Sequence, residues 1–303
     1  APEYACIDLS PDHVGLRLGT GDAGQGHRTA FAQILADELG LDPRGVRVLL
    51  GDTDEVAQGT GTFGSRSMAA AGTAIAACAE ALRDRLILEA ADELEVAAAD
   101  VVFAGGAFAV AGTDRRIDVA SLVRRRALTI SEERMLAARA PTFPNGCHVA
   151  EIEIDPETGA IDLVGYWAVE DLGTLVNPML ATGQVHGGVV QGIGQALLEA
   201  LVHDTQSGQL LSGSLMDYAM PRASDLPPLH VVSRPSATTA NALGAKGAGE
   251  AGTVGALAAV VNAVADALGA VGVETVPMPA TPFAVWSALN AATGSAPTSS
   301  GVY

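Results

Sequence analysis

The chain has 303 residues and a formal net charge of −18, from 17 lysine and arginine residues against 35 aspartate and glutamate residues. Its length predicts about two domains with a sizeable core. The acidic balance argues against nucleic acid and anionic membranes as partners, since both reward lysine and arginine. The sequence shows neither an uninterrupted apolar stretch of about 18 residues nor a signal peptide, so no membrane span is predicted.

The first half alternates strand and helix signals, separated by glycine-rich loops. The periodic patterns predict, in chain order, a hairpin of strands at 4–9 and 14–18, a helix at 27–39, a strand at 46–50, a helix from 67 to about 88 and a peripheral strand-and-helix segment at 90–140. This order, with a hairpin before the helices, argues against a strictly alternating βαβ sheet.

The second half repeats this kind of pattern. It predicts a hairpin of strands between 150 and 169 that turns at 155–159, a polar connection at 171–184, a helix at about 187–201, a second hairpin at 210–218, a helix after residue 252 and a loose tail after residue 289. The helix after residue 252 is expected to bury an apolar stripe of Val254, Leu257, Val261, Val264 and Leu268.

A weak internal repeat follows from these elements. A strand hairpin, a turn containing glycine and glutamine, and an amphipathic helix occur once in each half of the chain. We therefore expect an α+β fold in which two similar lobes, residues 1–140 and 141–303, surround a cofactor groove.

Two glycine runs match the dinucleotide-binding pattern GxGxxG, at residues 19–24 and 59–64. A dinucleotide fold would place a pyrophosphate on the following helix N-terminus and Asp52 on a ribose. In a chain with 35 glycines such matches arise easily. The strand before Gly19 is also predicted to be half of a hairpin rather than the first strand of a βαβ unit, so this hypothesis is disfavoured.

The same loops still offer groups for an anionic or heterocyclic ligand. Gly24, Gln25 and Gly26 present backbone N–H groups and an amide at a helix start, which suits such a ligand. Residues 64–67 present the hydroxyls of Ser65 and Ser67, the Arg66 guanidinium and another helix N-terminus, which suits a phosphate. Helix capping would explain both serines without any ligand.

Two further polar residues have two readings each. Gln184 lies between Gly183 and the helix expected near residue 187, where it either reads the edge of a ring or ties down its own loop. Glu250 lies among glycines and near Lys246 in the segment 244–252, ahead of an apolar helix. A carboxylate in such a turn is a candidate catalytic base, and a plain structural loop is the alternative.

Direct metal binding by side chains is not predicted. Cys6, Cys78 and Cys147 are scattered, and the six histidines show no paired metal spacing. Scattered cysteines of this kind suit a reducing cytoplasm. No serine nucleophile motif of the form GxSxG occurs either.

Taken together, these segments resemble the molybdenum-binding subunit of the xanthine oxidase family of molybdenum hydroxylases, which includes xanthine and aldehyde oxidoreductases and aerobic carbon monoxide dehydrogenase. The resemblance lies in GQGH at residues 24–27, GDTD at 51–54, GTFGSRS at 61–67, NGCH at 145–148, DLGTLVNP at 171–178, GQVHGG at 183–188, MDY at 216–218 and GAKGAGEAG at 244–252. It runs through almost the whole chain and is similar to the C-terminal half of such a subunit only.

The resemblance implies a molybdopterin cofactor, in bacteria usually the cytosine dinucleotide form, and an oxidoreductase that works only in a complex. The implied cofactor-binding residues are Gly24, Gln25, Gly26, Gly64, Ser65, Ser67, Asp171, Asn177, Gln184, Lys246 and Gly249. Glu250 matches the family's catalytic glutamate, the base for oxidative hydroxylation of an aldehyde or N-heterocycle, with CO oxidation as the related chemistry. The metal would be held by pterin sulfurs, which explains the lack of metal-ligand spacing.

The resemblance also implies partners. These are a chain carrying the N-terminal half of the molybdenum subunit, a [2Fe-2S] subunit, an FAD subunit and a small-molecule substrate. Aldehydes, purines, other N-heterocycles and carbon monoxide all stay open as substrates. The alternative is a non-catalytic protein that binds or assembles the molybdenum cofactor, with a nicotinamide-dependent dehydrogenase as a third hypothesis.

Overall fold

The computed structural model describes residues 2–292, which fall into two compact units. Unit 1 takes the residues up to Phe143, together with Leu172–Leu180 and Pro235–Gly247. Unit 2 takes Pro144–Asp171, Ala181–Arg234 and the residues from Ala248 onward. Two short segments from the second half of the sequence therefore belong to unit 1, whereas the expected lobes divided the chain once, after residue 140.

A four-stranded sheet with the strand order β3-β2-β1-β7 forms the centre of unit 1. Its strands are β1 (Glu3–Ser10), β2 (His13–Leu18), β3 (Val46–Leu50) and β7 (Ile130–Leu136). The predicted hairpin is confirmed, since β1 pairs antiparallel with β2. β3 pairs parallel with β2, and α1 (His27–Leu39) forms the crossover between them.

This crossover corrects one sequence expectation. β2 was expected to be half of a hairpin instead of the first strand of a βαβ unit, and it is both. The reason is that the two edges of one strand accept different neighbours, so the antiparallel pairing with β1 does not prevent a parallel pairing with β3. The fold is nevertheless α+β as predicted, because β1 and β7 pair antiparallel.

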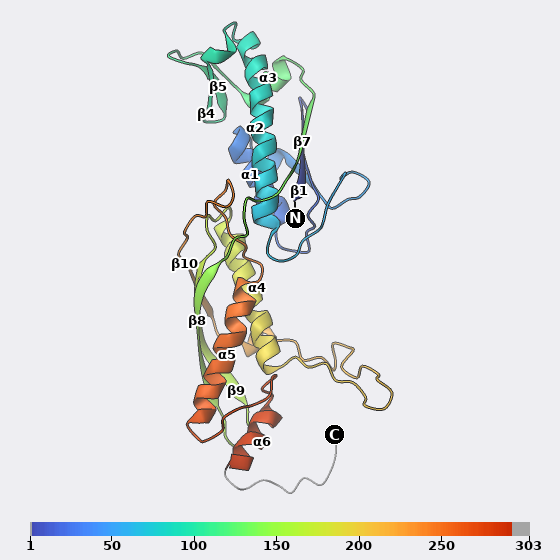
Figure 1. The fold of residues 1–303 in the computed structure, drawn as a ribbon, viewed down its shortest axis with the longest axis vertical. Coiled ribbons are helices and arrows are strands. Elements are labelled where there is room, and N and C mark those ends of the chain that lie inside the picture. Colours follow the sequence, from blue (N-terminus) through green and yellow to red (C-terminus); the bar gives the residue numbers. More distant parts are fainter. Residues whose placement is uncertain (1, 293–303) are drawn as a thin grey trace. The chain divides into compact units, whose positions relative to one another are not determined.

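The helices α1 and α2 (Ser67–Glu93) supply the other half of the core of unit 1 (Figure 1). Ile7 and Leu16 of the hairpin are fully buried with Phe31 and Leu35 of α1 and Ile75 of α2. Residues 94–128 form the predicted peripheral segment, with α3 (Val119–Arg125) and a small sheet of β4 (Val101–Ala104), β5 (Ala107–Val110) and β6 (Arg116–Asp118).

Unit 2 contains a three-stranded sheet of order β10-β9-β8. Its elements are β8 (Asn145–Ile154), β9 (Ile161–Asp171), α4 (Pro178–Leu197), β10 (Leu229–Ser233), α5 (Ala251–Gly269) and α6 (Pro282–Ala292). The predicted hairpin is confirmed as β8 and β9, and the Asp155 carboxylate holds its turn by accepting hydrogen bonds from Glu157 N and Thr158 Oγ1. β10 pairs parallel with β9. The tail predicted after residue 289 is helical up to Ala292 and otherwise lies outside the described residues.

Two predictions for α4 are wrong. The helix begins at Pro178 rather than near residue 187, so residues 178–184 are helical and not a polar connection. Asn177 starts it early, because its Oδ1 accepts a hydrogen bond from Leu180 N at 3.0 Å and proline is tolerated in the first turn. The helix also ends at Leu197, which leaves Leu201 exposed.

The hairpin predicted at 210–218 is wrong as well. The segment between α4 and β10 extends as a long arm (Figure 1), with one isolated bridge from His203 to Leu210 and no paired strands within the described residues. Side chains hold its turns, for example the Ser214 hydroxyl that donates to Asp217 Oδ2 at 2.6 Å. Apolar residues alone predicted a strand here, but a strand needs a partner edge.

The buried face of α5 differs from the predicted stripe. Val264 and Leu268 are buried as expected, but Val254 is 73% exposed. Gly252, Ala256 and Val260 complete the buried face. α5 is the one described helix that is long and apolar enough by composition to cross a membrane. Its buried stripe accounts for part of that apolarity, because it packs on β8.

Candidate functional site

Three loops of unit 1 meet at the end of β2 and before α1 and α2. The loop 19–26 follows β2, the loop 51–66 follows β3, and the segment 241–247 returns from the second half of the sequence. The backbones touch, since a Cβ atom on Gly19 would lie 2.5 Å from Gly59 Cα, and one on Gly247 would lie 2.3 Å from Ser65 O. Loops at the carboxyl ends of parallel strands are common ligand positions in α/β units.

The loop before α1 is fixed by Asp22. Its Oδ1 accepts hydrogen bonds from the backbone N–H groups of Gly24 and Gln25, both at 3.1 Å. The Gln25 side-chain oxygen accepts a further bond from Ala23 N at 2.6 Å. The N–H groups of Gly24 and Gln25 were expected to be free for a ligand, and Asp22 occupies them instead. Aspartate side chains commonly accept hydrogen bonds from the backbone two residues further along the chain, which forms an Asx turn.

The start of α1 carries no side-chain cap, because its N-cap residue is Gly26 in a left-handed conformation. Gly26 also lies against Leu180, whose side chain a Cβ would approach to 2.7 Å. Gly24 has a φ of +103° and no atom within 4 Å of the place where a Cβ would stand. The position is therefore open beside an uncapped helix N-terminus, which favours anions.

In the loop before α2, the side chains of Ser67 and Arg66, which were expected to bind phosphate, instead make contacts within the protein. Ser67 is buried, and its hydroxyl bonds to Thr20 Oγ1 at 2.9 Å and donates to Thr62 Oγ1 at 3.2 Å. The Arg66 guanidinium pairs with Glu3 Oε2 at 3.0 Å, inside unit 1. Burial raises the pKa of the Glu3 carboxyl, and the charge of Arg66 opposes that shift.

Gly64 and Ser65 remain as the outward part of this loop. Both are left-handed, with φ values of +55° and +53°. For serine this conformation is strained, and such strain is concentrated at functional sites. Gly64 has no atom within 4 Å of an added Cβ, whereas Ser65 contacts Gly247. The backbone at Gly64 is therefore exposed, with open space on the side where a Cβ would stand.

Asn177 and Lys246 complete the predicted residues of unit 1. Asn177 caps α4 with its oxygen, and its Nδ2 donates to Gln33 Oε1 at 2.9 Å. The half-buried Lys246 follows a short bridge between Gly173 and Ala245, and its N–H donates to Leu172 O. Asn241, which is buried, holds this segment through two bonds to Ala245.

The other predicted residues belong to unit 2. Glu250 is the N-cap residue of α5, and its side chain is exposed and does not cap the helix. Gly249 before it is exposed too. Gln184 lies within α4, half-buried, instead of between a loop and a helix, and Asp171 ends β9. The structure thus assigns eight predicted residues to unit 1 and four, Asp171, Gln184, Gly249 and Glu250, to unit 2.

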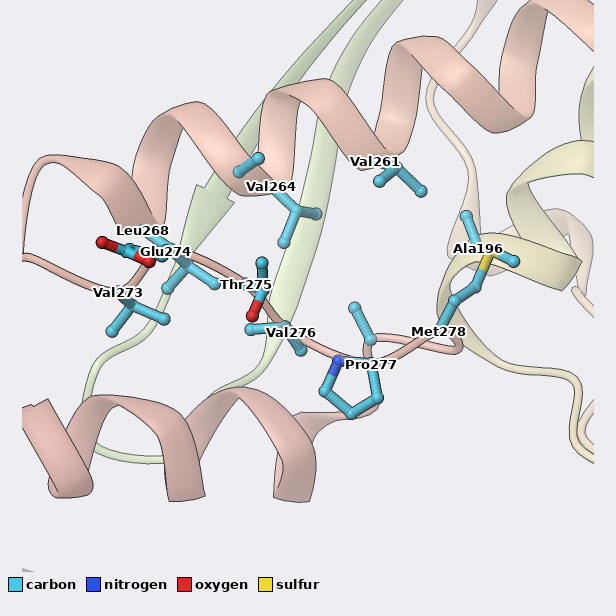
Figure 2. A pocket seen from close by; sticks show the side chains of 12 residues that line it. Ala196, Val261, Val264, Leu268, Val273, Glu274, Thr275, Val276, Pro277 and Met278 are labelled. Atoms are coloured by element: carbon cyan, nitrogen blue, oxygen red, sulfur yellow. The ribbon is translucent and has the colours of Figure 1, made fainter.

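An apolar pocket of unit 2 has a volume of about 130 Å³ (Figure 2). It lies between Val261, Val264 and Leu268 of α5 and the segment 273–280, and Glu274 is its one carboxylate. None of the predicted site residues lines it. It is therefore a packing space within unit 2 and is separate from the residues considered for catalysis.

The residues present fit a cofactor held by many hydrogen bonds rather than a metal held by side chains. Among residues 2–292, no cluster of three histidine, cysteine or carboxylate side chains is placed to hold a metal ion. The loops of unit 1 instead offer the N-terminus of α1 without a side-chain cap, and open space where a Cβ on Gly24 or Gly64 would stand. Such a donor set suits the phosphate and ring atoms of a pterin nucleotide.

Comparison with known proteins decides the family. Residues 1–227 match the family model described as the molybdopterin cofactor-binding domain. The chain is 36% identical over 248 residues to the nicotine 6-hydroxylase large subunit of Paenarthrobacter nicotinovorans and 35% identical over 283 residues to the carbon monoxide dehydrogenase large chain of Hydrogenophaga pseudoflava. These alignments cover 77% and 90% of the chain. The chain belongs to the molybdenum hydroxylase family. The resemblance predicted from its motifs is confirmed.

Solved structures of this molybdenum hydroxylase family have the same fold. A Cu,Mo carbon monoxide dehydrogenase superimposes with a TM-score of 0.89 at 31% identity over 97% of the chain. Quinoline 2-oxidoreductase from Pseudomonas putida 86 gives 0.87 at 33% identity over 95%. The chain spans 38% of each of these structures and about a third of the two curated relatives, 30% and 35%. It corresponds to part of the large subunit.

Proposed function

We propose that this chain is the part of a molybdenum oxidoreductase large subunit that binds molybdopterin and supplies the catalytic base, and that it acts only within a complex in the cytoplasm. One observation carries the second half of this proposal. Glu250 lies at the N-cap of α5 with its side chain exposed, after a glycine and ahead of a helix fixed in the core of unit 2. A plain cap residue would turn its side chain back to the helix.

The cofactor in this proposal is molybdopterin in its cytosine dinucleotide form. Gly24, Gln25 and Gly26 would bind it at the start of α1, and Gly64 and Ser65 at the loop before α2. The further residues assigned to cofactor binding are Ser67, Asp171, Asn177, Gln184, Lys246 and Gly249. Two of these roles are indirect in our proposal, because Ser67 and Asn177 use their side chains to fix the loops. When bound, the cofactor supplies two-electron oxidation chemistry.

Glu250 would take up the proton released at the reacting group. One feature suits its carboxylate to accept a proton at a fixed place. Its carbonyl oxygen accepts the first bond of α5, from Val254 N at 3.1 Å, which fixes the backbone. A positioned general base of this kind contributes on the order of 10²–10⁴-fold to a rate.

The relatives indicate the substrate classes. One relative is named for hydroxylation of nicotine and another for quinoline, both N-heterocycles, while two others are named for carbon monoxide. We propose an N-heterocycle, an aldehyde or carbon monoxide as the substrate. The partners would be a chain or segment supplying the rest of the large subunit, an iron–sulfur subunit and an FAD subunit.

The experiment that tests this proposal is metal and pterin analysis of the native complex, with its partner chains identified by mass. We expect molybdenum and pterin in equal amounts with this chain, together with iron–sulfur and flavin chains. A complex that binds NAD(H) and contains neither molybdenum nor pterin would contradict the proposal.

A second candidate function follows from where the residues lie. Most of the predicted cofactor-binding residues belong to unit 1, whereas Glu250 belongs to unit 2. A non-catalytic protein that binds or assembles the cofactor would need the first group and not the base. A stable monomer that binds pterin, shows no turnover and is unaffected by the loss of Glu250 would favour this alternative.

A further inference from the structure

A buried chain of three polar side chains lies inside unit 2. His148 of β8 bonds through Nδ1 to the Tyr166 hydroxyl at 2.5 Å and through Nε2 to Glu170 Oε1 at 2.7 Å. The side chains of His148 and Glu170 are only 5% and 3% exposed, and Tyr166 is fully buried. Tyr166 and Glu170 both belong to β9. None of the three has a role in the proposed chemistry.

Two glycines make room for these hydrogen-bonded side chains. A Cβ on Gly255 of α5 would lie 2.5 Å from ring atoms of His148, and a Cβ on Gly146 would lie 2.5 Å from Glu170 Oε2. The imidazole is therefore in direct contact with the backbone of α5 at Gly255. Real Cβ contacts are never this short, so any other residue at position 255 would displace the ring or the helix.

The contact between α5 and α4 is close and is made by small residues. α5 meets α4 through small residues, since a Cβ on Gly188 would lie 3.1 Å from Gly252 Cα and one on Gly192 would lie 2.8 Å from Ala256 Cβ. Small side chains let two helices approach, but they offer few projections that stop one helix from shifting along the other. The Thr253 hydroxyl, which lies 3.0 Å from both Gly188 O and Gln191 Oε1, is one specific contact of α5, and His148 is a second.

The polar character of these three buried side chains, His148, Tyr166 and Glu170, also needs an explanation. Burying charged or polar groups is costly, and well-packed apolar residues at such positions are often neutral or stabilising by comparison. The best-attested benefit of a buried polar group is that it fixes one register among several similar packings. The His148 ring is held from both sides by Tyr166 and Glu170 and packs against Gly255 of α5. This arrangement has the geometry for that role.

We infer that His148 is a positioning residue that sets the axial position of α5 and thereby the position of Glu250. This rests on the base role proposed for Glu250. Glu250 precedes Gly255 by five residues, or about 7.5 Å along a helix axis. A shift of α5 at Gly255 therefore also moves its N-cap residue, Glu250. Displacement of a catalytic group by about 1 Å can lower a rate on the order of 100-fold.

The test compares His148→Ala with Leu268→Ala in the assembled complex. Both remove a buried side chain that supports α5, but Leu268 lies at the far end of the helix. For His148→Ala we expect amide hydrogen exchange at residues 254–257 to rise at least about 10-fold, and kcat to fall at least about 10-fold with KM and pterin content unchanged. Leu268→Ala should leave the exchange at 254–257 and kcat close to the wild type.

Tyr166→Phe is the second variant, for use if His148→Ala does not fold. It removes one hydroxyl and keeps the packing of the ring. It should change exchange at 254–257 and kcat in the same direction by a smaller factor. Unchanged exchange there in the His148 or Tyr166 variants, or an equal loss of kcat in Leu268→Ala, would overturn the inference. Exchange is measured without turnover, so a complex that proves inactive would contradict the proposed function and still test the positioning.

Discussion

The two units contain the same sequence of elements and use it differently. In unit 1 the hairpin β1–β2 is followed by α1, a third strand parallel to β2, and α2. In the second half the hairpin β8–β9 is followed by α4, a third strand parallel to β9, and α5. The weak repeat expected from the sequence is therefore a ββαβα repeat in the structure.

The contrast lies at the start of the last helix in each repeat. Arg66 is the N-cap residue of α2, and its guanidinium is tied to the buried Glu3 and to the loop around it. Glu250 is the N-cap residue of α5, and its side chain is exposed. The first residue stabilises unit 1 through an ion pair and the second is exposed, so the same position in the repeat has different surroundings in the two halves.

The largest expected effect on stability tests the first half of this contrast. Arg66→Gln leaves the Glu3 carboxylate buried without its partner and removes bonds to Thr60 and Gly61. We expect unit 1 to lose about 3–5 kcal/mol of unfolding free energy at neutral pH, measured by urea denaturation. Arg44→Gln is the matched control, since its ion pair with Asp42 is exposed to solvent, and it should change nothing measurable.

The pH dependence of Arg66→Gln follows from the sign of the Glu3 shift. Burial raises the folded-state pKa of Glu3 and Arg66 lowers it, so removing Arg66 raises the pKa further. A group with a raised pKa contributes stability that is present at low pH and lost as the pH rises through the folded value. The deficit of the variant should therefore shrink as the pH falls from neutral into the acid range, and a deficit that grows as the pH falls would contradict this account.

A smaller effect is expected where α4 meets α5. A methyl group on Gly252 would lie 2.4 Å from Val185 O, so Gly252→Ala should cost about 1–3 kcal/mol by overpacking. Gly187 in α4 is exposed, with nothing within 4 Å of an added Cβ. Gly187→Ala should instead stabilise by about 0.5–1 kcal/mol, as alanine does in helices. Thermal denaturation of both variants tests this, and equal shifts of one sign would refute the close contact.

The smallest effect concerns the thiols. Cys147 is exposed, while Cys6 and Cys78 are buried. Burial raises the pKa of the Cys78 thiol to about 12, which leaves almost no thiolate at neutral pH. An alkylating reagent should therefore modify Cys147 alone in the folded protein and all three cysteines in urea, as read by mass. Rapid labelling of Cys78 in the folded protein would contradict the packing of α2 on β1.

Sequence periodicity predicted the elements in which apolar side chains form one buried face. Ile7 and Leu16 alternate on the hairpin, and Phe31 and Leu35 share a face of α1, so both elements were predicted with nearly the observed bounds. In the second half, prediction from periodicity failed where glycines lie inside helices. Gly183 and Gly187 looked like loop residues but lie within α4, and α5 buries Gly252 and Ala256 rather than Val254.

The predicted site shows the same limit. The glycine loops and Glu250 were predicted from short motifs and from the family resemblance that these motifs carry together. The pairing of Arg66 with Glu3 joins residues 63 positions apart, and His148 meets Tyr166 and Glu170 across a hairpin. Such partners depend on register and on side-chain direction, which the sequence pattern does not contain. His148 lay in a recognised motif, but its role needed the contact with Gly255.

The most direct test of the central claim is Glu250→Gln in the assembled enzyme, with turnover and pterin content measured on the same sample. The change removes the proton acceptor and keeps the size of the side chain. We predict a loss of turnover on the order of 100-fold or more, with molybdenum and pterin content almost unchanged. Near-normal turnover in that variant would contradict the claim that Glu250 is the base.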